Sequence, residues 1–92
     1  MGRTGVDVYP LQHGVGLEEV STFRKFLGGS ATNVAVAAAR HGHAVRLVTK
    51  VGDDAFGRYV RLEVERLGVD PASVSVHPAP GPPTPVTFCE VF

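Results

Sequence analysis

The chain has 92 residues, 43% of them apolar and 20% charged, and its nine Lys and Arg balance its nine Asp and Glu. A length below the ~100–150 residues of most domains allows one small domain or a part of a larger one, without room for a catalytic cleft between two domains. The balanced charge argues against nucleic acid as a partner, because binding to phosphates needs a surplus of Lys and Arg.

Cys89 is the single cysteine, so neither an internal disulfide nor a cysteine-based zinc site is expected, as is typical of a cytoplasmic protein. No apolar run reaches the ~18–20 residues that cross a bilayer, and no signal-peptide pattern is found. Met1-Gly2 begins like a myristoylation signal, but Val6 stands where that signal needs Ser or Thr. We therefore expect a cytoplasmic location and no membrane partner.

The first third of the chain predicts a strand followed by a small β lid. Apolar residues between Thr4 and Val8 stop at Tyr9-Pro10, because proline cannot continue a strand ladder. A turn signal at 13–16 precedes β-forming residues that are mixed with polar ones, as in a half-exposed strand. Residues 11–27 are therefore predicted to form a hairpin lid.

A first helix is predicted at about residues 31–41. Small polar side chains after Gly28-Gly29 can accept the free N–H groups of its first turn, and Gly42 can close it in the left-handed conformation. Small apolar residues occupy every face of this segment until Arg40. The helix is therefore expected to be buried and packed very close to a sheet.

A strand and a second helix follow. The residues from Ala44 to Val51 alternate, with one apolar face made by Val45, Leu47, Thr49 and Val51. Asp53-Asp54 can then supply the N-cap and the negative first turn of a helix through Leu67. Four apolar residues repeat at helical spacing along that helix, namely Phe56, Val60, Val64 and Leu67.

The remaining residues predict a short strand at 74–76, a stiff extended connection at 77–85 and a last strand at 84–92. This order of elements is typical of an α/β fold with right-handed crossovers. Two helices cannot cover both faces of such a sheet, and the last strand has apolar side chains with no further element to bury them. We therefore expect the chain to be part of a longer protein.

The segment Gly28-Gly29-Ser30-Ala31-Thr32-Asn33 is a candidate ligand site. Bare N–H groups at a helix start favour anions or hydroxyl oxygens. The segment lacks the Gly-Lys-Ser/Thr end of a Walker A loop and the three-glycine spacing of dinucleotide-binding folds, so a tight turn for close packing is an equal alternative. Asp7 ends the first strand at the edge where open α/β sheets bind ligands, so it can face the same crevice as Asn33. A solvated turn aspartate is the alternative there.

Other polar residues favour structural roles. The four histidines are dispersed, and His41 and His43 flank a helix end, which favours helix-end structure over metal binding. The adjacent carboxyls of Asp53-Asp54 rarely point together, so capping is the favoured use. Cys89 is interpreted as a core thiol. We assign no catalytic and no metal-ligating residue within the chain.

Three segments together resemble the amino-terminal signature of the ribokinase-like carbohydrate kinases, namely residues 28–39, 51–57 and 67–70. The resemblance implies the amino-terminal part of a ribokinase-like three-layer sandwich, residues 1–92 being the sugar-binding half, with lid elements at about 9–27 and 77–92. Residues 2–10 and 83–90 look most like members that phosphorylate a deoxy-keto sugar acid of inositol breakdown. Kinases of the 2-keto-3-deoxygluconate or fructose type remain alternatives.

The resemblance also implies roles for individual residues. Asp7 would accept hydrogen bonds from sugar hydroxyls, Gly28 and Gly29 would let the backbone approach the sugar, and Asn33 would both donate and accept. These roles suit phosphoryl transfer, which depends mostly on holding the hydroxyl in line with the γ-phosphate. Ser30 departs from the lysine of some sugar kinases in the family, which argues against a plain ribokinase.

Three parts expected of such a kinase lie outside these residues. They are the catalytic base, which is an Asp in a Gly-Ala-Gly-Asp motif, the ATP site and the Mg²⁺ site. We therefore expect ATP and Mg²⁺ to act in a full-length parent, and the chain by itself to be inactive. A homo-oligomer through the lid is compatible with the resemblance. The alternative from another functional class is a non-catalytic α/β module that binds a partner through its exposed last strand.

Overall fold

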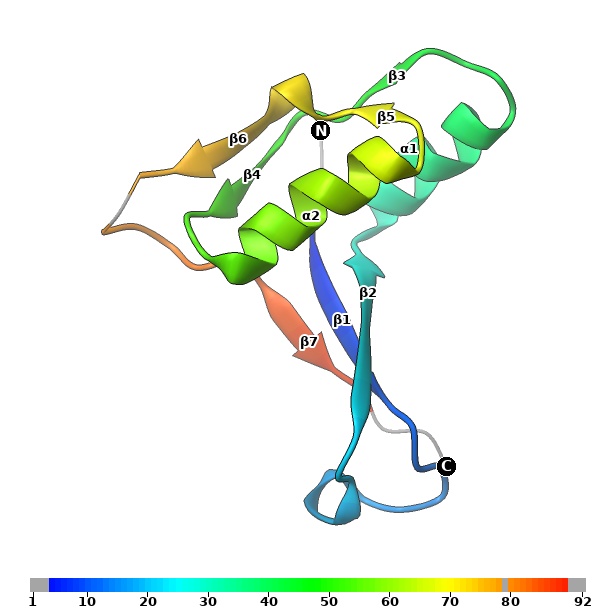
Figure 1. Cartoon of the computed structure of the whole chain (residues 1–92), viewed down its shortest axis with the longest axis vertical. Coiled ribbons are helices and arrows are strands. Elements are labelled where there is room, and N and C mark those ends of the chain that lie inside the picture. Colours follow the sequence, from blue (N-terminus) through cyan, green and yellow to red (C-terminus); the bar gives the residue numbers. More distant parts are fainter. Residues whose placement is uncertain (1–3, 79, 90–92) are drawn as a thin grey trace.

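The protein is described by a computed structural model that covers residues 4–78 and 80–89, and its fold is mixed α/β (Figure 1). The strands and helices are, in chain order, β1 (Gly5–Pro10), β2 (Phe23–Gly28), α1 (Ser30–Arg40), β3 (Val45–Arg46), β4 (Thr49–Gly52), α2 (Ala55–Arg66), β5 (Val69–Asp70), β6 (Val74–His77) and β7 (Val86–Phe88). Two short 3-10 turns, η1 (Leu17–Glu19) and η2 (Pro71–Ser73), precede β2 and β6.

The strands form three ladders. In the first, β1 lies between β2, which is antiparallel to it, and β7, which is parallel to it; we call this β2–β1–β7 group the lid sheet. The other two ladders are the parallel pairs β3–β5 and β4–β6. Helix α2 connects β4 to β5, as parallel strands require a crossover. Figure 1 shows the lid sheet extending away from the helices, with the η1 turn at its far end.

The core lies where the helices meet the strands. Val60 and Val64 of α2 are fully buried, and α2 contacts β1, β4 and β5. The buried apolar residues are Val6, Val8, Ala35, Leu47, Val51, Val60, Val64, Val69 and Val74. Full burial of such a side chain contributes roughly 1.5–3 kcal/mol, so this cluster fixes α2 against one face of β1.

The helix predictions are confirmed in position and wrong in part of their packing. Helix α1 spans Ser30–Arg40, and Gly42 follows it at a φ of 86°. Its predicted burial on every face is wrong, because only Thr32 and Ala35 are buried and Val34 is 69% exposed. Within the described residues, the strands cover only one side of this helix. Phe56, predicted on the buried face of α2, is 39% exposed at the first turn.

The predicted strand at 44–51 is divided into β3 and β4. Its alternation is confirmed, since Leu47 and Val51 are buried while Arg46 and Lys50 are exposed. The division follows from its partners: β3 pairs with β5 and β4 with β6, and the η2 turn separates β5 from β6. Pro71 begins that turn and has no N–H to donate to a ladder.

The predicted hairpin within 11–27 is also corrected. The segment supplies one strand, β2, which pairs with β1 along its whole length, Gly5 lying opposite Gly28 and Pro10 opposite Phe23. The first strand therefore continues past Val8 to Pro10. The predicted strand at 74–76 is confirmed as β6, and that at 84–92 is seen as Val86–Phe88, its last residues lying outside the described part.

Candidate functional site

The lid sheet has two different faces. Cross-strand partners share a face, so the pairs Asp7–Phe26 and Tyr9–Arg24 place these four side chains together. The opposite face carries Val6 and Val8 of the core and turns toward α2, where the Lys25 Nζ lies 4.7 Å from the centre of the Tyr59 ring. One face is thus covered by α2, and the other carries the polar side chains.

Asp7 lies directly over Gly28. A Cβ atom added to Gly28 would stand 2.4 Å from the Asp7 Oδ1, so any larger residue there would collide with the carboxylate. Gly29 is required for a different reason: its φ is 98°, a conformation that side chains disfavour, and it is the N-cap of α1. The two glycines therefore let β2 turn into α1 beside the Asp7 carboxylate.

Asn33 completes this corner from the first turn of α1. Its side chain is exposed, and its backbone N–H donates to the Gly29 carbonyl at 3.1 Å. A hollow of about 560 Å³ lies between this turn and the lid sheet. It is lined by Asp7, Tyr9, Pro10, Leu11, His13, Arg24, Phe26, Leu27 and Asn33. The expectation that Asp7 and Asn33 face the same crevice is therefore confirmed as geometry.

The Asp7 carboxylate of this hollow is open to a ligand. Within residues 4–78 and 80–89 the Asp7 carboxylate accepts no hydrogen bond and forms no ion pair, which leaves its oxygens available to donors. The Cys89 thiol, and after it the Asp7 carboxylate, raise the pKa of the Tyr9 hydroxyl, so that this hydroxyl stays protonated. The hollow thus combines the open carboxylate of Asp7 with the amide of Asn33, whereas the Tyr9 hydroxyl is already hydrogen-bonded to the Cys89 side chain.

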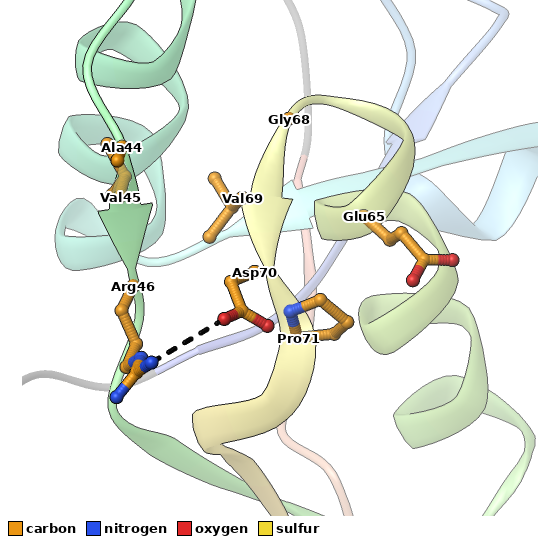
Figure 2. A pocket seen from close by; sticks show the side chains of 8 residues that line it. All are labelled: Ala44, Val45, Arg46, Glu65, Gly68, Val69, Asp70 and Pro71. Atoms are coloured by element: carbon orange, nitrogen blue, oxygen red, sulfur yellow. Dashed lines mark ion pairs between the residues drawn. The ribbon is translucent and has the colours of Figure 1, made fainter.

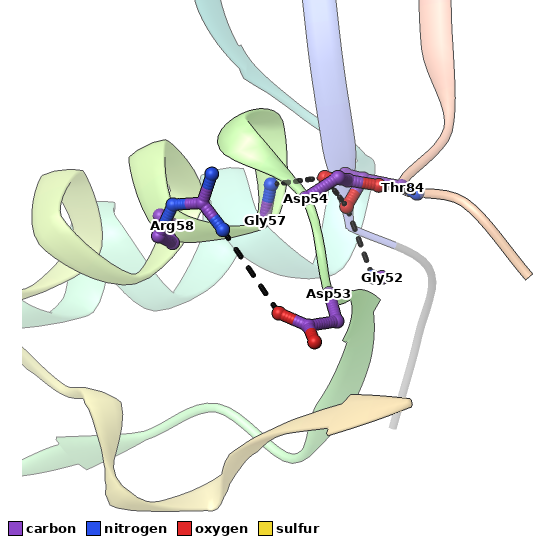
Figure 3. A network of polar contacts seen from close by, with 6 residues as sticks. All are labelled: Gly52, Asp53, Asp54, Gly57, Arg58 and Thr84. Atoms are coloured by element: carbon purple, nitrogen blue, oxygen red, sulfur yellow. Dashed lines mark hydrogen bonds and ion pairs between the residues drawn. The ribbon is translucent and has the colours of Figure 1, made fainter. Parts of the chain in front are cut away.

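A second aspartate, Asp54, has the opposite environment (Figure 3). Its carboxylate accepts from the Gly57 N–H at 2.7 Å, from the Thr84 N–H at 2.9 Å and from the Thr84 Oγ1 at 2.8 Å. The Thr84 hydroxyl in turn accepts from the Gly52 N–H at 2.9 Å. The backbone N–H of Thr84 is the main cause that lowers the pKa of Asp54. The predicted capping role is confirmed, and its link to Thr84 was not predicted.

Another hollow, drawn in Figure 2, lies beside β3 and β5. Arg46 and Asp70 are cross-strand partners there, with their charged atoms 3.8 Å apart and their side chains 66% and 47% exposed. Exposed ion pairs of this kind contribute at most about 1 kcal/mol. The two opposite charges that face each other across this hollow are thus already paired, which makes it a weaker candidate.

The remaining candidates keep structural positions. His41 caps the end of α1 through its backbone N–H, and His43 follows it, as predicted. Cys89 is only half-buried, so its interpretation as a core thiol holds in part, and its N–H donates to the Val8 carbonyl at 3.0 Å.

Among the described residues no three His, Cys, Asp or Glu side chains gather as a metal site would need. No helix found there is long and apolar enough to span a membrane.

Comparison with known proteins gives consistent results. Residues 1–91 match the pfkB family of carbohydrate kinases. The chain is 43% identical over 70 residues to the 5-dehydro-2-deoxygluconokinase of Photobacterium profundum, which covers 76% of the chain and 21% of that protein. It is 35% identical over 92 residues to the 5-dehydro-2-deoxygluconokinase of Lacticaseibacillus casei. This alignment covers 100% of the chain and 28% of that protein.

Solved structures agree in fold. An uncharacterized sugar kinase from Pyrococcus horikoshii in complex with ATP superposes with a TM-score of 0.84 at 33% identity, over 95% of this chain and 28% of that one. A PfkB protein from Polaromonas superposes with a TM-score of 0.86 at 28% identity, over 95% of this chain and 29% of that one. The α/β fold expected from the resemblance to ribokinase-like kinases is therefore confirmed. The chain spans less than a third of the length of these relatives.

Proposed function

The chain belongs to the pfkB family of carbohydrate kinases, and we propose that it forms the sugar-binding part of an ATP-dependent kinase for 5-dehydro-2-deoxygluconate. The observation that carries this proposal is the hollow shared by Asp7 and Asn33, in which Asp7 has no partner among the described residues. The names of the curated relatives support the choice of sugar acid, a compound of inositol catabolism.

The geometry of the hollow suits a polyhydroxylated ligand. The Asp7 carboxylate would accept from sugar hydroxyls, and the Asn33 amide would donate to one hydroxyl and accept from another. Gly28 and Gly29 would let the sugar approach the backbone closely, since neither has a side chain to block it. These contacts would hold one hydroxyl in line for transfer, which is the main demand of phosphoryl-transfer catalysis.

The phosphate donor and the base belong, in this proposal, to parts of the full-length enzyme outside these 92 residues. The related Pyrococcus sugar kinase was solved with ATP, which supports ATP as the donor, with Mg²⁺ to neutralise its phosphates. The chain alone would therefore transfer no phosphate. We place the enzyme in the cytoplasm, where ATP is available. Exposed Phe23 and Phe88, with ring centres 5.8 Å apart, would give the lid sheet an apolar patch for a homo-oligomer.

A substrate panel tests the proposal. The full-length protein would be assayed for ATP-dependent phosphorylation of 5-dehydro-2-deoxygluconate, 2-dehydro-3-deoxygluconate, fructose and ribose. We expect kcat/KM to be at least ~10-fold higher for the first compound, a difference of about 1.4 kcal/mol in transition-state binding. Preference for another sugar would contradict the assigned substrate. Absence of transfer to every sugar would favour the non-catalytic module instead.

A further inference from the structure

We propose that Arg24 binds the carboxylate of the sugar acid and thereby makes the site prefer acidic over neutral sugars. The inference rests on the proposed function and adds a residue to it. It starts from the hollow that contains Asp7 and Asn33, where Arg24 is the one lining residue among those described whose side chain is positively charged throughout the physiological pH range.

The register of the lid sheet sets the position of Arg24. Arg24 lies opposite Tyr9, and Phe26 lies opposite Asp7, so Arg24 shares the open face with Asp7. Tyr9 is two residues beyond Asp7 on β1, which places Arg24 roughly 7 Å further along the strands. That displacement is about the length of a six-carbon sugar acid. Hydroxyls near Asp7 and a carboxylate near Arg24 can therefore be bound at the same time.

The guanidinium of Arg24 is available. It lies over the Phe26 ring, 5.6 Å from its centre, and stacking on a ring face leaves the N–H edge free to donate. Within residues 4–78 and 80–89 it forms no ion pair. Three other arginines do pair with carboxylates, namely Arg46, Arg58 and Arg66. Arg24 thus differs from them: it lines the hollow without an ion-pair partner among the described residues, and Asp7 of the same hollow does not pair with it.

The electrostatics of the hollow favour one orientation of an acidic ligand. The Asp7 carboxylate repels a second carboxylate placed beside it, so the acid group of the ligand must lie further along the strands of the lid sheet. Arg24 supplies the opposite charge there, and its planar fork can donate two parallel hydrogen bonds to a carboxylate. A neutral sugar would gain the contacts to Asp7 and Asn33 only.

The neighbouring residue Lys25 provides a matched control. It follows Arg24 on the same strand, but its ammonium group faces α2 over the Tyr59 ring. Arg24→Met and Lys25→Met therefore remove the same charge from opposite faces of β2. Binding of 5-dehydro-2-deoxygluconate and of its uncharged primary amide to the full-length protein would be measured by calorimetry without ATP.

We expect Arg24→Met to weaken binding of the acid by ~10–100-fold and of the amide by less than ~3-fold, as for loss of hydrogen bonds between charged groups. Arg24→Lys should keep part of the preference, and Lys25→Met should change neither ligand by more than ~2-fold. The inference is overturned if Arg24→Met weakens both ligands equally or neither. If Arg24→Met fails to fold, Arg24→Gln replaces it as the neutral variant, and equal weakening of both ligands or of neither by Arg24→Gln would also overturn the inference.

The substrate panel distinguishes failure of the role of Arg24 from failure of the proposed function. A wild-type enzyme that prefers the acid, with an Arg24→Met variant that keeps this preference, would reject Arg24 and leave the proposed function intact. A wild-type enzyme that prefers fructose or ribose would reject the proposed substrate, and the role of Arg24 with it.

Discussion

Two aspartates, each beside a glycine, have opposite environments in this molecule. Asp54 accepts hydrogen bonds from Gly57 and twice from Thr84, and so joins the start of α2 to the segment before β7. Asp7 lies over Gly28 and accepts none from the described residues. A carboxylate whose oxygens are occupied by the chain serves the fold. One whose oxygens face an open hollow is available for a ligand, and this difference predicts different effects of mutation.

The largest expected effect is on stability, at Asp54. Asp54→Ala in the full-length protein removes the N-cap of α2 and both bonds to Thr84, so we expect the free energy of unfolding to fall by about 2–4 kcal/mol. Urea denaturation measures this change. Asp53→Ala is the control, because the one contact of the Asp53 side chain within the described residues is an exposed ion pair with Arg58 at 3.9 Å, and its loss should cost less than ~1 kcal/mol. Equal losses for the two variants would refute the structural role of Asp54.

The next effect is on activity, at Asp7. Asp7→Asn keeps the size of the side chain but removes the charge that strengthens hydrogen bonds from hydroxyls, so kcat/KM for the sugar should fall by roughly 10–100-fold. The melting temperature should change little. His41→Ala and His43→Ala, at the other end of α1, should change kcat/KM by less than ~2-fold. Steady-state kinetics with both substrates varied would reject the assignment if only the KM for ATP rose.

A smaller effect is expected at the glycine that faces Asp7. Gly28→Ala would bring a Cβ to 2.4 Å from the Asp7 Oδ1, and this carboxylate can rotate away. We therefore expect the KM for the sugar to rise about 3–10-fold, with a modest change in stability. Gly57→Ala is the contrast, since its Cβ would meet the Gly52 carbonyl oxygen at 2.1 Å, and a backbone atom cannot yield in this way. Thermal melts and sugar kinetics on both variants test this contrast. A larger loss of stability for Gly28→Ala than for Gly57→Ala would contradict it.

The smallest effect concerns pH. Hydrogen bonds from Thr84 lower the pKa of Asp54 in the folded protein, so its stabilising contribution is complete above the unfolded pKa of about 3.9. That contribution is lost as the pH falls through the lower folded value. The stability difference between wild type and Asp54→Asn should therefore be constant from pH 7 to 5 and shrink at lower pH. A difference that grows on acidification would contradict the assignment.

The sequence predicts best what depends on neighbouring residues. The ends of both helices follow from Gly42 and Asp54, each within a few residues of the helix it closes or caps. The common hollow of Asp7 and Asn33 was anticipated because a strand end and a glycine-rich helix start have known places in α/β folds. The α/β fold class followed from the order of the expected strands and helices, and the ribokinase-like architecture from the resemblance that three short motifs carry.

What the sequence did not predict depends on pairing between distant segments. Asp54 and Thr84 are 30 residues apart, and no local pattern indicates their contact. The position of Arg24 depends on the β1–β2 register. The sequence predicted a hairpin within 11–27 instead, so the pairing of β2 with β1 was not considered. The exposed side of α1 was missed because small apolar residues on every face look the same whether or not a partner covers them.

The central claim, that the hollow beside Asp7 binds the sugar, is tested most directly by a crystal structure of the full-length protein with 5-dehydro-2-deoxygluconate. We predict sugar hydroxyls within about 2.5–3.0 Å of the Asp7 carboxylate oxygens, with another near the Asn33 amide. The Asp54 network should be unchanged by the ligand. A sugar bound in the hollow beside Arg46 and Asp70, or in the groove between α1 and α2, with Asp7 left to solvent, would contradict the claim.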